Sequence, residues 1–199
     1  MKIVVVGATG TIGKAVVAAL ADRHEIVKVG SKSGDHQVDI KDAQSIRKLF
    51  EKTGRFDALV ATAGKVHFGD FAALTEKEVA TGLRDKLMGQ VNLVLIGRDF
   101  INDNGSFTLT SGVLSHEPIR FGTCASLVNG ALEAFVMAAA VELPRGLRIN
   151  VVSPGVLVES LPVFGDYFRG HEAVPGKRVG NAYLKAVEGR LTGQVLSVL

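Results

Sequence analysis

The chain has 199 residues, 47% of them hydrophobic, which is enough for one well-buried domain, expected to span residues 1–199. Its net charge of +3 is not gathered into a basic cluster, and Trp is absent, so nucleic acid is not an expected partner. Cys124, the single cysteine, cannot form an internal disulfide, and no Cys/His cluster has metal-ligand spacing; a reducing, cytoplasmic compartment and no metal site are predicted.

The chain starts with a strand, a glycine-rich turn and a helix written contiguously. An apolar run over residues 3–6 leads directly into Gly7-Ala8-Thr9-Gly10-Thr11-Ile12-Gly13, and a helical pattern follows. Glycines in such a turn permit positive φ and close approach of a ligand, and the unpaired first amides of the helix suit a phosphate. The turn lacks a Gly-Lys-Ser/Thr ending, which favours a dinucleotide pyrophosphate over a nucleoside triphosphate. A purely structural turn is the alternative.

Apolar runs and helical patterns then alternate along the chain. Further strands are expected at residues 26–29, 58–61, 107–110, 148–152 and 195–198. Their continuous hydrophobicity is typical of a parallel sheet covered on both faces. Helices are expected after an Asp42 cap, from a Thr75-x-x-Glu78 capping box, and from Thr123 to Leu143. No run is expected to be long enough to cross a membrane, so no membrane association is predicted.

Several motifs occur in the order and spacing of one family. They are Gly7-x-x-Gly10-x-x-Gly13, Val38-Asp39-Ile40, Ala61-Thr62-Ala63-Gly64, Gly105-Ser106-Phe107, Ala131-Leu132-Glu133-Ala134-Phe135, Arg148-Ile149-Asn150-Val151-Val152-Ser153-Pro154-Gly155 and Leu191-Thr192-Gly193-Gln194-Val195-Leu196. Over essentially its whole length the sequence resembles a short-chain dehydrogenase/reductase. The resemblance implies a single-domain α/β fold, a Rossmann-type doubly wound parallel sheet of about seven strands, with Val38 near a short third strand. It also implies a homodimer or homotetramer formed through the two long middle helices.

The resemblance further implies a nicotinamide cofactor bound across the C-terminal ends of the strands. The pyrophosphate would lie at the glycine turn, against Gly7, Thr9, Gly10, Thr11, Ile12 and Gly13. The other expected cofactor residues are Asp39 and Ile40 beside the adenine, Ala63 and Gly64 beside the ribose, and Pro154 and Gly155 beside the nicotinamide.

The choice between NADP and NAD depends on a position about 20 residues beyond the glycines, where NAD enzymes carry an acid. Here the sequence reads Gly30-Ser31-Lys32-Ser33. An ammonium and two hydroxyls suit a 2′-phosphate, so Ser31, Lys32 and Ser33 predict NADP(H), with NAD less favoured. Asp35 is the one nearby acid that would restore NAD binding. Lys32 as a solvated loop lysine is the other interpretation.

The family's catalytic Asn, Ser, Tyr and Lys are all altered in this alignment. The motifs place the Tyr at Ala125, the Lys at Asn129, the Ser at Gly112 with Ser111 one place earlier, and the Asn near Lys86. Lys86 and Asn129 together suggest an exchange, in which the lysine comes from the earlier helix and the amide from the later one. The alternatives are that Lys86 extends along the core to water and that Asn129 makes a structural hydrogen bond.

Two functions remain open at this point. The first is an NADP(H)-dependent oxidoreductase acting on a small carbonyl or alcohol, with Lys86, Ser111 and Asn129 as catalytic residues. Its proton donor would come from Ser111, His67, His116 or Tyr167, the last within an expected substrate lid at residues 157–174. The second is a non-catalytic NADP(H)-binding sensor or regulatory module.

Overall fold

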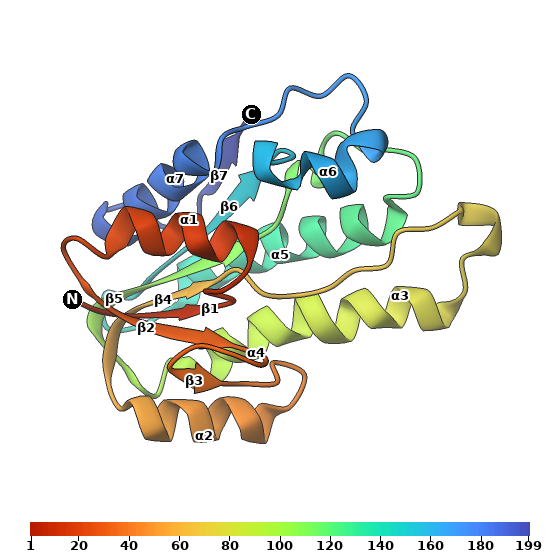
Figure 1. The fold of residues 1–199 in the computed structure, drawn as a ribbon. Coiled ribbons are helices and arrows are strands. Elements are labelled where there is room, and N and C mark those ends of the chain that lie inside the picture. The colour runs from red at the N-terminus through yellow and green to blue at the C-terminus, as the bar shows by residue number, and fades with distance from the viewer.

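The computed structural model describes residues 1–199, which form one α/β domain around a single seven-stranded sheet (Figure 1). The strand order is β3-β2-β1-β4-β5-β6-β7, and all neighbouring strands are parallel. The strands are β1 (Lys2–Val6), β2 (Glu25–Gly30), β3 (His36–Gln37), β4 (Phe56–Ala61), β5 (Ile101–Thr110), β6 (Arg148–Pro154) and β7 (Val195–Val198). The predicted Rossmann-type doubly wound sheet is confirmed.

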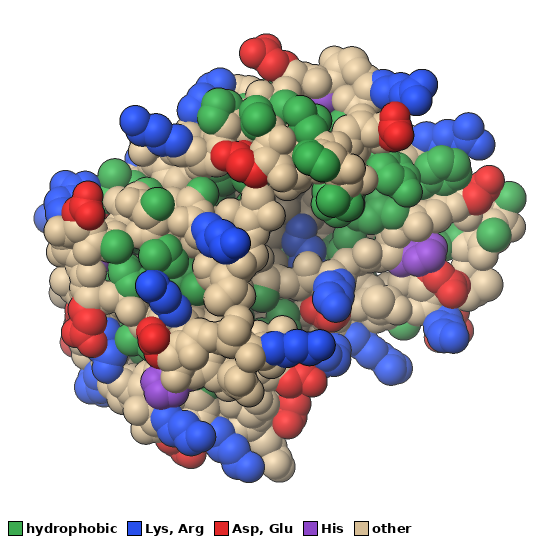
Figure 2. Space-filling model, in the orientation of Figure 1, with side chains coloured by type: hydrophobic (Ala, Val, Ile, Leu, Met, Phe, Trp, Pro, Cys, Tyr) green, Lys and Arg blue, Asp and Glu red, His purple; other side chains and the backbone are tan.

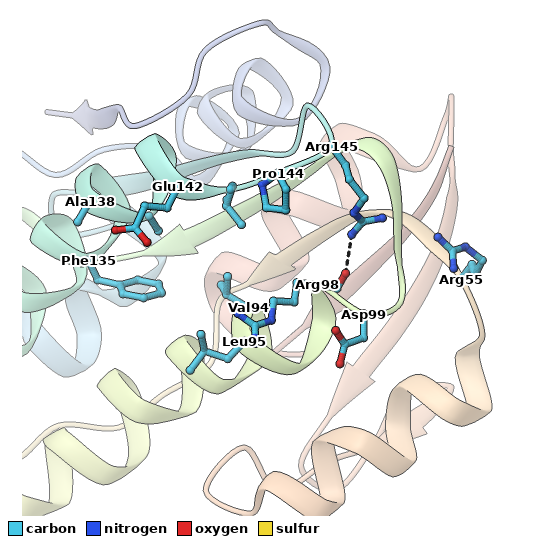
Figure 3. Close-up of a pocket in the computed structure, with 12 residues that line it drawn as sticks. Arg55, Val94, Leu95, Arg98, Asp99, Phe135, Ala138, Glu142, Pro144 and Arg145 are labelled. Carbon is cyan, nitrogen blue, oxygen red and sulfur yellow. Dashed lines mark hydrogen bonds between the residues drawn. The ribbon is translucent and has the colours of Figure 1, made fainter.

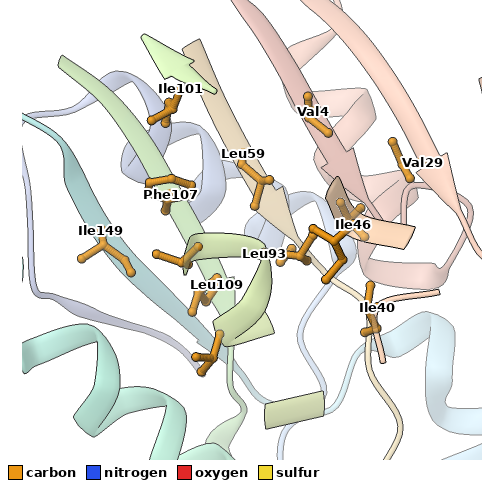
Figure 4. Packing of buried hydrophobic residues seen from close by; sticks show 14 of the residues in the cluster. Val4, Val29, Ile40, Ile46, Leu59, Leu93, Ile101, Phe107, Leu109 and Ile149 are labelled. Atoms are coloured by element: carbon orange, nitrogen blue, oxygen red, sulfur yellow. The ribbon is translucent and has the colours of Figure 1, made fainter. Parts of the chain in front are cut away.

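Helices cover both faces of this sheet (Figure 1). One face carries α1 (Thr11–Leu20) and α7 (Gly176–Glu188), and the other carries α2 (Ala43–Thr53), α4 (Met88–Gly97) and α5 (Thr123–Glu142). Each face has its own apolar core, because strands buried on both sides present side chains to both. In Figure 4, Ile46 of α2 and Leu93 of α4 pack toward Leu59 of β4.

The helix starts follow the sequence signals. The carboxylate of Asp42 accepts the backbone N–H of Gln44 at 2.9 Å, which caps α2. At α3 (Glu76–Gly82), Glu78 accepts the backbone N–H of Thr75 at 3.1 Å and completes the capping box. A π-helical turn, Leu83–Leu87, joins α3 directly to α4. Such turns are rare and occur frequently at functional sites.

The expectation that no segment is long and apolar enough to cross a membrane is wrong for α5. The helix has 20 residues and contains an 18-residue stretch with a mean hydropathy of 1.7, so by length and composition it is apolar enough to cross a membrane. In this fold it is a core helix, since Val128, Leu132 and Val136 are fully buried against the sheet. Its opposite face is also apolar, which explains its high hydropathy.

The strand order reverses between β1 and β4, and the C-terminal strand ends at this point form the usual binding edge of a doubly wound sheet. Short helical segments lie above this edge: Phe71–Ala73, Val113–Ser115, Val158–Ser160, α6 (Leu161–Phe164) and Gly165–Tyr167. The predicted lid contains the last three, and a bridge between Leu157 and Val174 closes its base.

Candidate active site

A cavity of about 360 Å³ opens at the ends of β1 and β4. Eight of the predicted cofactor residues line it: Gly7, Thr9, Gly10, Ser31, Asp39, Ile40, Ala63 and Gly64. The other predicted cofactor residues are not in its lining: Thr11, Ile12, Gly13, Lys32, Ser33, Pro154 and Gly155. The lining also contains residues that the sequence does not single out, among them Lys41, Lys65 and Asp85.

The three glycines of the turn differ in what a side chain at each position would contact. Gly7 has a φ of +89°, and a Cβ there would lie 2.7 Å from Thr62 Oγ1. A Cβ at Gly13 would overlap the carbonyl oxygen of Gly7, so this glycine brings the helix against the turn. Gly10 is different, because a Cβ there would have one neighbour, Gly7 O at 3.4 Å, and otherwise open space.

The turn fits a pyrophosphate. Gly10 is the N-cap of α1 and offers no side chain to the first amides of the helix. Those amides have no intrahelical acceptor, and the helix dipole favours a negative charge in front of them. The open side of Gly10 therefore leads to a ready-made anion site.

The loop after β2 borders the cavity. Ser31 lines the cavity, whereas the backbone carbonyl of Lys32 accepts a hydrogen bond from the Gln37 amide at 3.0 Å. Asp35 turns back toward the strand, and its carboxylate accepts the backbone N–H of Lys28 at 2.8 Å. The acid that would favour NAD is therefore used in holding the loop.

Lys86 lies in the π-helical turn and points inward. Its ammonium donates to the carbonyl oxygen of Ser111 at 2.8 Å and to Asn129 Oδ1 at 2.7 Å. Its stem packs on Gly64, where a Cβ would lie 2.7 Å from three carbon atoms of Lys86. Burial lowers the pKa of Lys86 to about 8, and the charge of Glu133 opposes this shift. Lys86 therefore adjoins the cavity through Gly64, and its ammonium is directed to protein acceptors instead of extending to water.

Asn129 connects the lysine to the end of β5. Its Oδ1 accepts from Lys86, while its Nδ2 donates to the carbonyl oxygen of Gly112 at 3.2 Å. Both ends of the amide are used, so its orientation is fixed. Sequence reasoning placed Lys86 and Asn129 on two helices, and the structure brings them together with Ser111.

Gln90, one helical turn after Lys86, fixes the same strand end. It is fully buried, its Nε2 donates to the carbonyl of Thr110 at 3.0 Å, and its Oε1 accepts the N–H of Thr110 at 2.9 Å. The carbonyl of Ser111 that holds Lys86 therefore follows a residue clamped at both backbone groups. The four-residue spacing from Lys86 is the signal for Gln90 in the sequence.

Ser111 also meets a buried acid on α5. Its hydroxyl donates to Glu133 Oε1 at 2.7 Å, and Ser115 donates to the same oxygen at 2.8 Å. The other oxygen of Glu133 lies 3.0 Å from His116 Nε2. Sequence reasoning missed Glu133 as a site residue, although it follows Asn129 by four positions and so lies on the same helix face.

The remaining candidate donors are Tyr167 and His67. Tyr167 of the lid packs on Phe68 and Phe121, with ring centroids 5.9 and 6.3 Å apart. His67 lies beside Phe68 in the loop that follows Gly64. Burial raises the pKa of Cys124, which argues against a nucleophilic thiolate there. Figure 2 shows a hollow near the middle of this face, with a basic side chain in its floor and hydrophobic side chains gathered to one side.

Comparison with known proteins identifies the family and the fold of the chain. The family model described as enoyl-(acyl carrier protein) reductase matches residues 2–173. The crystal structure of the protein lin1944 from Listeria innocua is 44% identical with a TM-score of 0.99, and the match covers 100% of both chains. A small-chain dehydrogenase solved in complex with NADPH is 26% identical with a TM-score of 0.88, covering 100% of this chain and 96% of that one.

A sequence relative from Methylorubrum extorquens, an uncharacterized oxidoreductase, is 29% identical over 78% of this chain and 72% of its own length. The family match extends over far more than half of the chain and includes the glycine turn, the π-helical turn and the long helix α5. The chain therefore belongs to the short-chain dehydrogenase/reductase family of oxidoreductases.

Proposed function

We propose that the protein is an NADP(H)-dependent oxidoreductase that interconverts a small carbonyl compound and its alcohol through an altered catalytic tetrad. Ala125 and Asn129 stand where the family has its Tyr and Lys, and Lys86 stands where it has its Asn. The observation that carries the proposal is the inward-facing Lys86 ammonium, held by Ser111 and Asn129 beside the cofactor cavity.

The Lys86 ammonium can donate a hydrogen bond to a substrate oxygen. Two of its three N–H bonds are directed to protein acceptors, which leaves one for a ligand. A pKa of about 8 makes Lys86 an effective proton donor near neutral pH. Ser111 is a poorer donor, because its hydroxyl proton is directed to Glu133. We therefore assign proton transfer to Lys86, and the holding of Lys86 to Ser111 and Asn129.

Carbonyl reduction adds a hydride to carbon and a proton to oxygen. A bound nicotinamide supplies the hydride. Lys86 would polarise the carbonyl and deliver the proton, and the aromatic side chains of the lid would exclude water from a small uncharged substrate.

NADP(H) is the proposed cofactor. The small-chain dehydrogenase that is 26% identical was solved with NADPH. In this chain Asp35, the acid of the loop after β2, is bonded to the backbone N–H of Lys28. Ser31, Lys32 and Ser33 then offer two hydroxyls and an ammonium to the 2′-phosphate.

Cofactor preference is tested by titrating the protein with NADPH and NADH. We expect NADPH to bind more tightly, and Lys32→Glu to reduce the affinity ratio by about tenfold or more, because a carboxylate repels the 2′-phosphate. Lys48→Glu on the exposed side of α2 is the matched control and should leave the ratio unchanged. Equal affinities in the wild-type protein, or an unaltered ratio in Lys32→Glu, contradict the assignment.

One observation favours the sensor function as second candidate. Ala125 is buried in a small apolar cluster with Val113 and Leu114, so no hydroxyl takes the place of the family tyrosine. The two functions are separated by following NADPH oxidation over small aldehydes and ketones. Turnover supports the oxidoreductase, and NADPH binding without turnover on any of them supports the sensor.

We also propose a second copy of this chain as a partner, bound across α4 and α5. The apolar side chains Leu95, Leu127, Met137 and Val141 are exposed there. Figure 3 shows Leu95 and Phe135 facing a pocket of about 760 Å³ between the two helices. The pocket carries Arg98 and Arg145 as well as Asp99 and Glu142, a mixed set that can pair with itself across a two-fold axis.

We propose a cytoplasmic location for the protein, because the thiol of Cys124 is free and buried, as expected in a reducing compartment.

A further inference from the structure

Glu133 is a buried carboxylate in the wall of the proposed active site. It lies on α5 one helical turn after Asn129, and only 4% of its surface is exposed. Removing a carboxylate from water is costly unless its hydrogen-bonding capacity and its charge are both compensated. The contacts of Glu133 account for the first requirement and leave the second open.

The direct partners of Glu133 are two hydroxyls and an imidazole. Ser111 and Ser115 donate to Oε1 at 2.7 and 2.8 Å, and His116 Nε2 lies 3.0 Å from Oε2. The hydroxyls are neutral, and His116 is largely exposed and carries a charge only when it is protonated. These contacts therefore satisfy the oxygens without a constant positive charge.

The ammonium of Lys86 supplies the missing charge from the other side of Ser111. The carbonyl oxygen of Ser111 accepts from Lys86, while its hydroxyl donates to Glu133. Asn129, on the same helix face as Glu133, accepts from the same ammonium. Opposite charges thus flank one residue in a poorly solvated place, where their attraction is much stronger than in water.

The other charged groups on the neighbouring elements make their contacts elsewhere. Asp85, next to Lys86 on the π-helical turn, accepts the backbone N–H of Lys65 at 3.1 Å. Lys65 itself lines the cofactor cavity. On the far side of Glu133 the facing group is His116. On α3, Glu78 is bonded to Thr75 in the capping box.

We propose that Glu133 is a positioning residue that acts through Lys86: its carboxylate keeps Lys86 in the ammonium form and fixes the Ser111 carbonyl that holds it. The proposal rests on the proposed role of Lys86 as the donor to the substrate oxygen. Burial alone lowers the pKa of Lys86, and the charge of Glu133 raises it toward the value of about 8.

The test is a direct titration of Lys86 by NMR in protein with ¹³Cε-labelled lysine, the resonance being assigned by its absence in Lys86→Met. Glu133→Gln, which keeps the shape and removes the charge, should lower the Lys86 midpoint by about one unit. At pH 8 the ammonium fraction then falls about fivefold, and carbonyl reduction should fall with it. Glu51→Gln, at an exposed position of α2, is the control and should leave the midpoint unchanged.

Glu133→Asp keeps the charge but withdraws it from the serines, and it should give a smaller downward shift. It replaces Glu133→Gln if that variant does not fold. An unchanged Lys86 midpoint in the folded variant overturns the proposal. The titration needs no substrate, so a lowered midpoint in a protein that turns over no carbonyl supports the charge coupling while contradicting the proposed function.

Discussion

Lys86 has to remain partly desolvated and charged at the same time. Its two acceptors, Ser111 O and Asn129 Oδ1, compensate only part of the hydration that an ammonium loses on burial. The folded protein therefore binds this proton less tightly than the unfolded chain, with a pKa of about 8 against the ordinary 10.5. The same property that makes Lys86 a good proton donor makes it a cost to stability at neutral pH.

This cost should be visible in the pH dependence of unfolding. Between pH 8 and 10.5 the unfolded state holds the Lys86 proton and the folded state has released it. The destabilisation caused by Lys86 therefore becomes smaller, and the unfolding free energy rises, as the pH increases through this range. The unfolding free energy of the wild type minus that of Lys86→Met should increase over this range by up to about 3 kcal/mol. Urea unfolding at pH 7.5 and pH 10 measures the difference, and a constant difference contradicts a buried ammonium.

The sequence predicts part of this arrangement. Helical spacing places Lys86 beside an apolar face, and the alignment pairs it with Asn129. It does not predict that the ammonium points inward, because that depends on the carbonyl of Ser111, which arrives from β5. The role of Glu133 could not be predicted from the sequence for the same reason, because its partners Ser111, Ser115 and His116 come from a different segment.

At the scale of elements, the glycines of the turn fall into two groups: Gly7 and Gly13 are required by backbone packing, whereas Gly10 faces the space that a ligand would enter. Gly13 and Gly7 cannot carry a Cβ without displacing backbone, so substitutions there disturb the turn itself. Gly10 has space for one more carbon, and that space belongs to the cavity. Gly10 is therefore the position at which ligand approach can be tested without breaking the fold.

Gly10→Ala should weaken NADPH binding by about tenfold or more, because its Cβ occupies the path of the pyrophosphate. Its thermal unfolding midpoint should stay close to that of the wild type. Gly130→Ala, at a helical position with no neighbour within 4 Å, is the matched control and should bind NADPH normally. Retention of wild-type affinity in Gly10→Ala means that the turn has only a structural role.

The sequence predicts the strands of the sheet better than its last helix. Continuous β-branched runs identify strands directly, because both faces of a parallel sheet are buried. Helix α7 was not expected, although Val179, Tyr183 and Val187 recur every four residues and are fully buried in it. Polar and glycine residues between them weaken the pattern, and Gly180 is required by contact, since a Cβ would lie 2.6 Å from Ala15 O.

At the scale of the whole molecule, the outer faces of α4 and α5 expose the apolar side chains Leu95, Leu127, Met137 and Val141, and exposed apolar surface of this kind can mark an interaction site. We expect a homodimer or homotetramer in light scattering coupled to size-exclusion chromatography. Met137→Glu should shift it toward the monomer, because a charge is costly in a desolvated interface. Val163→Glu, at a more exposed apolar position in the lid region, is the control and should leave the assembly unchanged. A wild-type protein that is monomeric at micromolar concentration contradicts this assembly.

The central claim is that Lys86 delivers the proton in an NADP(H)-dependent reduction, and Lys86→Met tests it most directly. The substitution keeps most of the stem and deletes the charge, and Lys48→Met on α2 is the control. On a carbonyl substrate found with the wild type, we expect NADPH affinity within about twofold of normal and turnover at least about a hundredfold lower. Wild-type turnover in folded Lys86→Met, with NADPH bound, would contradict the account.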